Sequence, residues 1–187
     1  CLLDCCAALE KNSKKQIELV QEAVRVLGEI RPDNAHLAAN LHANLGALYH
    51  KSGRMDLAKL HMEQGVLLLE EYGLTGCHDS VIQICNYATL LADMGEPQRA
   101  YSALLKLSRT VKELNSHQCL DYGMIQQTMG SICVIRGDLT QAELHLARAM
   151  AVFEMVLEDE PVLLEQKRWE IDQAAQIGRL QNQKLLV

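Results

Sequence analysis

Aromatic residues are scarce in this sequence, at 4% of the chain, with one Trp and one Phe. This scarcity disfavours a β-sandwich, because strands are enriched in aromatic and β-branched side chains. Three prolines and no Gly- or Ser-rich run leave no candidate for a flexible linker. Hydrophobic residues still make up 49% of the chain, so it can bury a core. That core must consist mainly of aliphatic residues and Met, which suits closely packed helices.

Basic clusters and long apolar runs are missing too. The formal net charge is −6 and the Lys and Arg residues are scattered, so the chain offers no electrostatic footprint for nucleic acid. The longest strongly apolar stretch, residues 66–69, is far too short to cross a membrane. We therefore predict a cytoplasmic protein without nucleic-acid or membrane partners. Because the sequence begins at Cys1, we expect it to be a fragment that could have a targeting segment upstream.

Seven cysteines, an odd number, include no CxxC pair. Cys5, Cys85 and Cys133 fall among apolar residues of helical stretches, where a thiol behaves as a small hydrophobe. We predict reduced structural thiols, as is usual in a cytosolic setting. The alternative is a redox or metal role, which no ligand spacing in the sequence supports.

A repeat with a period of 42 residues is the most informative feature of the sequence. Three columns of small residues keep this spacing without a gap: Gly53, Gly95 and Gly137; Ala58, Ala100 and Ala142; and Gly46, Ala88 and Gly130. Glycine adopts the left-handed conformation without a Cβ penalty, so the first column predicts a sharp turn after a helix. The other two columns allow the axes of two paired helices to approach to about 8 Å.

Signals for helix starts follow these turns. Pro97 suits the first position of a helix, and Asp138 with Gln141 resembles a capping box. Residues 2–9 and 13–27 predict two earlier helices, and Pro161 predicts the start of a last one. We therefore predict an all-α fold, a right-handed α-solenoid of antiparallel helix pairs with about nine helices.

We expect a single domain over residues 1–187. It would consist of a truncated first pair (1–31), three clear repeats (33–74, 75–115 and 116–159) and a C-terminal capping helix (160–187).

One stretch of the repeat carries a known motif. The pattern Leu45-Gly46-x-x-Tyr49, followed by Gly53, Ala58 and Gly65, resembles the tetratricopeptide repeat. The period of 42 residues, with Asn44 and Asn86 just before the core of the first helices, is similar to the longer repeats of kinesin light chains and related bacterial arrays. The resemblance covers most of the chain. It implies a superhelix whose concave groove, lined by the first helix of each pair, holds an extended or helical peptide.

The resemblance also implies which residues face this groove. They are Asn40, Asn44, Ala47, His50 and Lys51 in the first clear repeat, Cys85, Asn86, Thr89 and Asp93 in the second, and Gln127, Thr128 and Ser131 in the third. Asn44 and Asn86 are the leading candidates, because an amide can both donate to and accept from a peptide backbone. The alternative is that each amide bonds its own helix or a nearby loop. The basic clamp with which some family members bind a C-terminal carboxylate is missing, since Lys51 is the main cation.

Catalytic and metal-binding motifs are absent from the sequence: it has no GxSxG, no HExxH and no phosphate-binding Gly loop. His61 and His145 are equivalent residues two repeats apart, and His42 and His50 lie about two helical turns apart, so we predict packing or solvent-facing imidazoles. We expect Trp169 to pack in the end cap, and the alternative is an exposed anchor for a partner.

These patterns predict a scaffold module that binds a protein or a peptide, is not an enzyme and needs no cofactor or metal. Two alternatives remain open at this point. The chain could be the peptide-sensing domain of a larger regulator, or a self-association module that forms a homo-oligomer.

Overall fold

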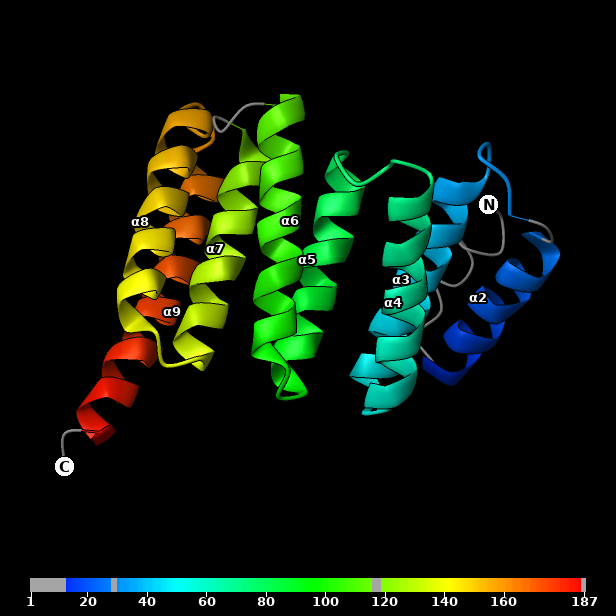
Figure 1. The fold of residues 1–187 in the computed structure, drawn as a ribbon, viewed down its shortest axis with the longest axis horizontal. Helices are drawn as coiled ribbons and strands as arrows, with labels where there is room; N and C mark the ends of the chain where they lie inside the picture. The colour runs from blue at the N-terminus through cyan, green and yellow to red at the C-terminus, as the bar shows by residue number, and fades with distance from the viewer. Residues whose placement is uncertain (1–12, 28–29, 116–118, 186–187) are drawn as a thin grey trace. The chain divides into compact units, whose positions relative to one another are not determined.

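The computed structural model describes residues 13–27, 30–115 and 119–185, and these ranges contain helices and short turns but no strand. The eight helices are α2 (Ser13–Leu27), α3 (Ala35–Lys51), α4 (Met55–Glu71), α5 (His78–Asp93), α6 (Pro97–Asn115), α7 (Leu120–Ile135), α8 (Leu139–Val156) and α9 (Pro161–Leu185), as drawn in Figure 1. The predicted all-α class is confirmed. The further helix predicted over residues 2–9 lies outside the described residues.

The chain divides into two compact units, Cys1–Gln83 and Ile84–Val187. In the first unit, α3 packs against both α2 and α4. In the second unit, α7 packs against α6 and α8, and α9 packs against α7 and α8. The turns that join α3 to α4 and α7 to α8 are short, so the two helices of each pair run antiparallel (Figure 1).

Glycine makes the turn inside each helix pair, as the 42-residue register predicts. The φ angle is 76° at Gly53, 81° at Gly95 and 76° at Gly137. In the first turn the Gly53 N–H donates to the carbonyl of His50 at 2.9 Å, and the Arg54 N–H donates to that of Tyr49 at 2.9 Å. These two bonds form a Schellman motif, which satisfies the last carbonyls of α3.

The predicted helix starts are also confirmed. Pro97 is the first residue of α6. At the start of α8, Oδ1 of Asp138 accepts a hydrogen bond from the backbone N–H of Gln141 at 3.2 Å. This bond satisfies one of the N–H groups that a helix leaves open at its N-terminus.

Small residues let the paired helices approach closely. Ala58, Ala100 and Ala142 are buried. A Cβ atom on Gly130 would lie 2.7 Å from Cγ of Leu146, and one on Gly46 would lie 3.2 Å from the carbonyl oxygen of Ala58. These contacts leave no room for a larger side chain, so the small-residue columns are packing positions.

Helix α9 covers one side of the α7–α8 pair. A cluster of buried side chains joins α8 to α9: Leu146, Ala149, Phe153, Leu157 and Ile171. Trp169 is instead 64% exposed, so the prediction that it packs in the end cap is wrong. The helical period gives the reason, because a residue two positions before Ile171 points about 200° away around the helix.

Candidate functional site

The exposed side of α3 carries the candidate residues of the first unit. Asn44, Ala47, His50 and Lys51 are exposed, and Asn40 is half-buried. They alternate at helical spacing with the buried residues that face α4 and α2. This helix therefore presents small and polar side chains to the solvent at the positions inferred from the sequence.

On α5 the candidate residues differ in exposure. Asn86, Thr89 and Asp93 are exposed, whereas Cys85 is buried. The Cys85 thiol lies within hydrogen-bonding reach of Thr128 on α7, and burial raises the pKa of this thiol to about 12. Cys85 therefore contributes to packing inside the second unit and does not present its side chain to a ligand.

On α7 the candidate residues are half-buried. Nε2 of Gln127 donates to Oε2 of Glu170 on α9 at 2.9 Å, and Nζ of Lys167 lies 2.8 Å from the same oxygen. Burial acts to raise the pKa of Glu170, but the hydrogen bonds from Gln127, Lys167 and Gln166 lower it below its usual value. The structure therefore brings Gln127 together with α9, an association that the sequence did not indicate.

The candidate hydroxyl groups donate to their own helices. Oγ1 of Thr89 donates to the carbonyl of Cys85 at 3.0 Å, and Oγ1 of Thr128 donates to that of Met124 at 2.9 Å. Oγ of Ser131 does the same toward Gln127 at 3.2 Å. Because their protons are already used, these hydroxyls can offer a ligand only acceptor lone pairs.

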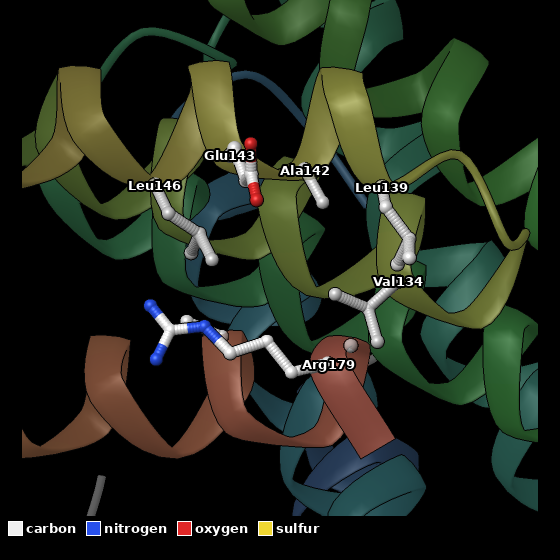
Figure 2. Close-up of a pocket in the computed structure, with 8 residues that line it drawn as sticks. Val134, Leu139, Ala142, Glu143, Leu146 and Arg179 are labelled. Atoms are coloured by element: carbon white, nitrogen blue, oxygen red, sulfur yellow. The ribbon is translucent and has the colours of Figure 1, made fainter. Parts of the chain in front are cut away.

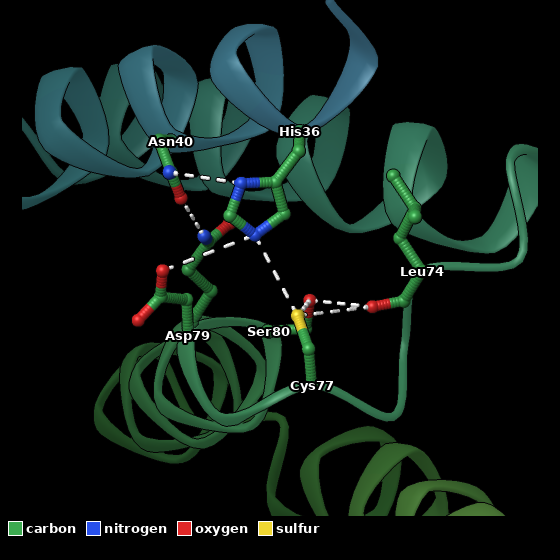
Figure 3. A network of polar contacts seen from close by, with 7 residues as sticks. His36, Asn40, Leu74, Cys77, Asp79 and Ser80 are labelled. Atoms are coloured by element: carbon green, nitrogen blue, oxygen red, sulfur yellow. Dashed lines mark hydrogen bonds and ion pairs between the residues drawn. The ribbon is translucent and has the colours of Figure 1, made fainter. Parts of the chain in front are cut away.

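Asn40 belongs to a polar network at the start of α5, shown in Figure 3. Nδ2 of Asn40 lies 3.3 Å from Nδ1 of His36, and Oδ1 of Asn40 accepts a hydrogen bond from Nε2 of Gln83. Nε2 of His36 lies 3.5 Å from Sγ of Cys77, which in turn lies 2.8 Å from Oγ of Ser80. Sequence reasoning missed this network, because it joins residues about forty positions apart that share no motif.

Charge is sparse on the first helices of the three pairs. Lys51 is the single Lys or Arg within α3, α5 and α7. Each of these helices also has few acidic residues, such as Asp93 at the end of α5. Such faces favour a neutral or amphipathic segment over one that depends on a charged terminus.

Buried polar pairs cross two of the helix pairs. Nδ1 of His42 lies 3.1 Å from Nδ1 of His61, and Oε1 of Gln126 lies 2.8 Å from Nδ1 of His145. The second pair follows the first by 84 residues at both positions, which is two periods. Burial lowers the pKa of all three imidazoles, and the charge of His61 lowers that of His42 further. These histidines are packing residues, as the sequence predicted.

A small cavity opens between α8 and α9, beside the end of α7 (Figure 2). Its volume is about 90 Å³. It is lined by Val134, Leu139, Ala142, Leu146, Ala175 and Gly178, with Glu143 and Arg179 as the charged members. A cavity of about 150 Å³ binds benzene. This smaller one therefore suits a short aliphatic side chain.

Metal ligands do not gather in the described residues: no three or more His, Cys, Asp or Glu side chains there are arranged to hold an ion. Within the same residues no helix combines the length and apolarity that a membrane span requires. Cys77, Cys85, Cys119 and Cys133 are free thiols.

Comparison with known proteins adds one relative and one solved structure. No protein-family model matches the chain. Tetratricopeptide repeat protein 23-like from Mus musculus is 26% identical over 187 aligned residues, which cover 91% of this chain and 39% of that protein. The chain thus spans about two fifths of the length of this curated relative. The crystal structure of BtubC (BKLC) from P. vanneervenii matches with a TM-score of 0.74 and 22% identity, over 91% of this chain and 68% of that one.

The resemblance to tetratricopeptide repeats is confirmed by both comparisons. BtubC is a kinesin light chain-like bacterial protein, which agrees with the similarity that the 42-residue period indicated. At 22% identity this likeness concerns the fold alone. A helical repeat fold of this kind is consistent with a protein-interaction scaffold.

Proposed function

We propose that this chain is a scaffold module that binds peptide segments of partner proteins on the exposed sides of α3, α5 and α7. One observation carries the proposal: Asn44 and Asn86, which are 42 residues apart, are both exposed at equivalent positions of α3 and α5. Ala47 and Thr89, three residues further along each helix, are exposed as well. A repeated amide beside a small side chain allows a backbone to approach and to form hydrogen bonds.

The chemistry of these sides suggests the kind of partner. They hold amides, hydroxyl acceptors and small apolar groups, with Lys51 as the single basic residue. We propose a neutral or amphipathic segment, extended or helical, whose backbone bonds the amides. The proposal includes the division into repeats at 33–74, 75–115 and 116–159, each of which contains one helix pair.

The experiment uses peptides selected from a displayed library on the wild-type chain. Their affinity is then measured by calorimetry for Asn44→Ala, Asn86→Ala and a control variant, Gln64→Ala. Gln64 is an exposed amide on α4, the second helix of its pair. A lost neutral hydrogen bond removes about 0.5–1.5 kcal/mol, so each Asn variant should bind roughly two- to tenfold more weakly. If the selected peptides keep full affinity for both Asn variants and lose it with Gln64→Ala, the proposed surface is wrong.

Self-association is a second candidate function, and the exposed side of α9 favours it. Val162, Trp169 and Leu180 are 85%, 64% and 52% exposed. They lie 7 and 11 residues apart, on one side of the helix opposite the buried Ile171. Glu165 and Arg179 are near opposite ends of this stripe. Two antiparallel copies of α9 would therefore bring unlike charges together while burying the stripe.

Sedimentation velocity over a range of concentrations tests this second candidate. A wild-type dimer should dissociate in Trp169→Gln but persist in Leu114→Gln, which removes an equally exposed apolar side chain from α6. A wild-type chain that stays monomeric at every concentration would exclude self-association.

A further inference from the structure

A thiol and an imidazole meet at the start of α5, as Figure 3 shows. Sγ of Cys77 lies 3.5 Å from Nε2 of His36, although the two residues are 41 positions apart in the sequence. Both groups are accessible, since Cys77 is exposed and 39% of the His36 side chain is exposed. A cysteine beside a base is the arrangement that activates thiols as nucleophiles.

The imidazole is held in place by other side chains. The Asn40 amide bonds Nδ1 of His36 at 3.3 Å and is itself bonded by the amide of Gln83. Turning both amides by half a rotation keeps their mutual bond and brings an acceptor to Nδ1, which leaves Nε2 free to receive a proton. Oδ2 of Asp79 lies 3.9 Å from Nε2, where its charge stabilises the imidazolium that forms. Nucleophile, base and orienting group are therefore all present.

The sulphur of Cys77 is positioned as well. The carbonyl of Cys77 accepts the N–H of Val81 at 3.0 Å, which makes Cys77 the residue that begins α5. Its Sγ lies 2.8 Å from Oγ of Ser80, and that hydroxyl donates to the carbonyl of Leu74 at 2.6 Å. These contacts hold the thiol on the side of the helix that faces His36.

The other well-characterised thiols have opposite surroundings. Cys85 and Cys133 are buried, and burial raises the pKa of each. A thiol in such a site is a poor nucleophile, because attack requires the thiolate. Among the described cysteines, Cys77 is thus the one that combines exposure with a neighbouring base.

We propose that Cys77 and His36 form a reactive thiol site that exchanges with small disulfides of the glutathione class. Sγ of Cys77 attacks one sulphur of the disulfide, and a new S–S bond forms as the old one breaks. The thiol proton passes to Nε2 of His36 and then to the departing thiolate. Cys77 is oxidised to a mixed disulfide and the released half is reduced to a thiol, so electrons and protons balance. This reaction does not depend on peptide binding.

The test treats the full, folded chain with dithiodipyridine and, separately, with glutathione disulfide near neutral pH. Absorbance of the released thiopyridone gives the rate, and peptide mass mapping identifies the cysteine. We expect Cys77 to react first and faster than free glutathione at the same pH. His36→Gln keeps a hydrogen-bonding side chain but removes the base. It should slow Cys77 about tenfold, less than positioned bases contribute in enclosed sites because this pair is open to water.

His78→Gln is the matched control, because it removes an exposed imidazole adjacent to Cys77 in the chain. It should leave the rate of Cys77 unchanged. An equal slowing by both variants would overturn the proposal, as would a full rate in His36→Gln or a Cys77 no faster than glutathione.

A second measurement needs no variant and therefore no assumption that His36→Gln folds. In urea Cys77 loses His36, so it should react more slowly in the unfolded chain than in the native one. An ordinary exposed thiol would show no such loss on unfolding. Equal or faster reaction of Cys77 in urea would overturn the proposal.

Discussion

Replacing a turn glycine with alanine should destabilise this fold through the backbone alone. The φ angles of Gly53, Gly95 and Gly137 lie between 76° and 81°, and a Cβ atom built on any of them meets no atom within 4 Å. Steric clash with other residues therefore contributes nothing. The remaining term is the left-handed backbone itself, which costs an L-residue with a Cβ about 1–2 kcal/mol. For a chain of this length that loss lowers the melting temperature by roughly 2–8 °C.

Urea unfolding followed by far-UV circular dichroism measures this loss. Because the three glycines share one geometry, the three alanine variants should lose similar amounts of free energy. Asparagine at the same position is the matched control, since its side chain tolerates left-handed backbone better than alanine does. Gly95→Asn should therefore lose clearly less than Gly95→Ala. Equal losses for Asn and Ala, or no loss in any alanine variant, would refute the backbone explanation.

Three further outcomes follow from the buried contacts. Burial lowers the pKa of His42 and His61 from the ordinary value of 6.5, so the unfolded chain binds more protons, and stability present above about pH 6.5 should fall as the pH drops below it. Denaturant midpoints across this range measure the fall, and His42→Gln, which copies the third pair, should make it shallower. A Cβ atom on Gly123 would lie 2.5 Å from Cε1 of the buried Phe153, so Gly123→Ala should cost about 1–3 kcal/mol in thermal unfolding, and adding Phe153→Leu should restore part of it. At concentrations where the chain is monomeric, Trp169→Gln should change the free energy of unfolding by less than about 0.5 kcal/mol, whereas Phe153→Ala should cost about 3–5 kcal/mol; a large loss in the former would mean that Trp169 is packed.

The candidate side of α3 was predictable because helical spacing separates its residues from the core. Asn44 and Ala47 fall between apolar residues at intervals of three and four, so they had to point outward once the helix was recognised. Cys85 could not be assigned in this way. A thiol is at home both in a core and at a surface, and its burial depends on the position of Thr128 on another helix.

The network around His36 was out of reach for a different reason. No motif relates His36 to Cys77, and their contact depends on how α3 lies beside the start of α5. The same holds for Gln127 and Glu170, which meet only because α9 packs against α7. Trp169 shows the opposite failure, since its apolar character suggested packing while its position around the helix exposes it.

By itself, the sequence determined the period, the turns and the small-residue packing columns of this protein. Those features depend on local physics: a glycine at left-handed φ, a proline at a helix start, and the absence of a Cβ where two axes approach. Only the tertiary structure decided which polar groups meet, such as His36 with Cys77, because contacts between helices depend on the rotation of each helix about its axis. Few positions of a helix point at a given neighbour, and the sequence of one helix does not state which they are.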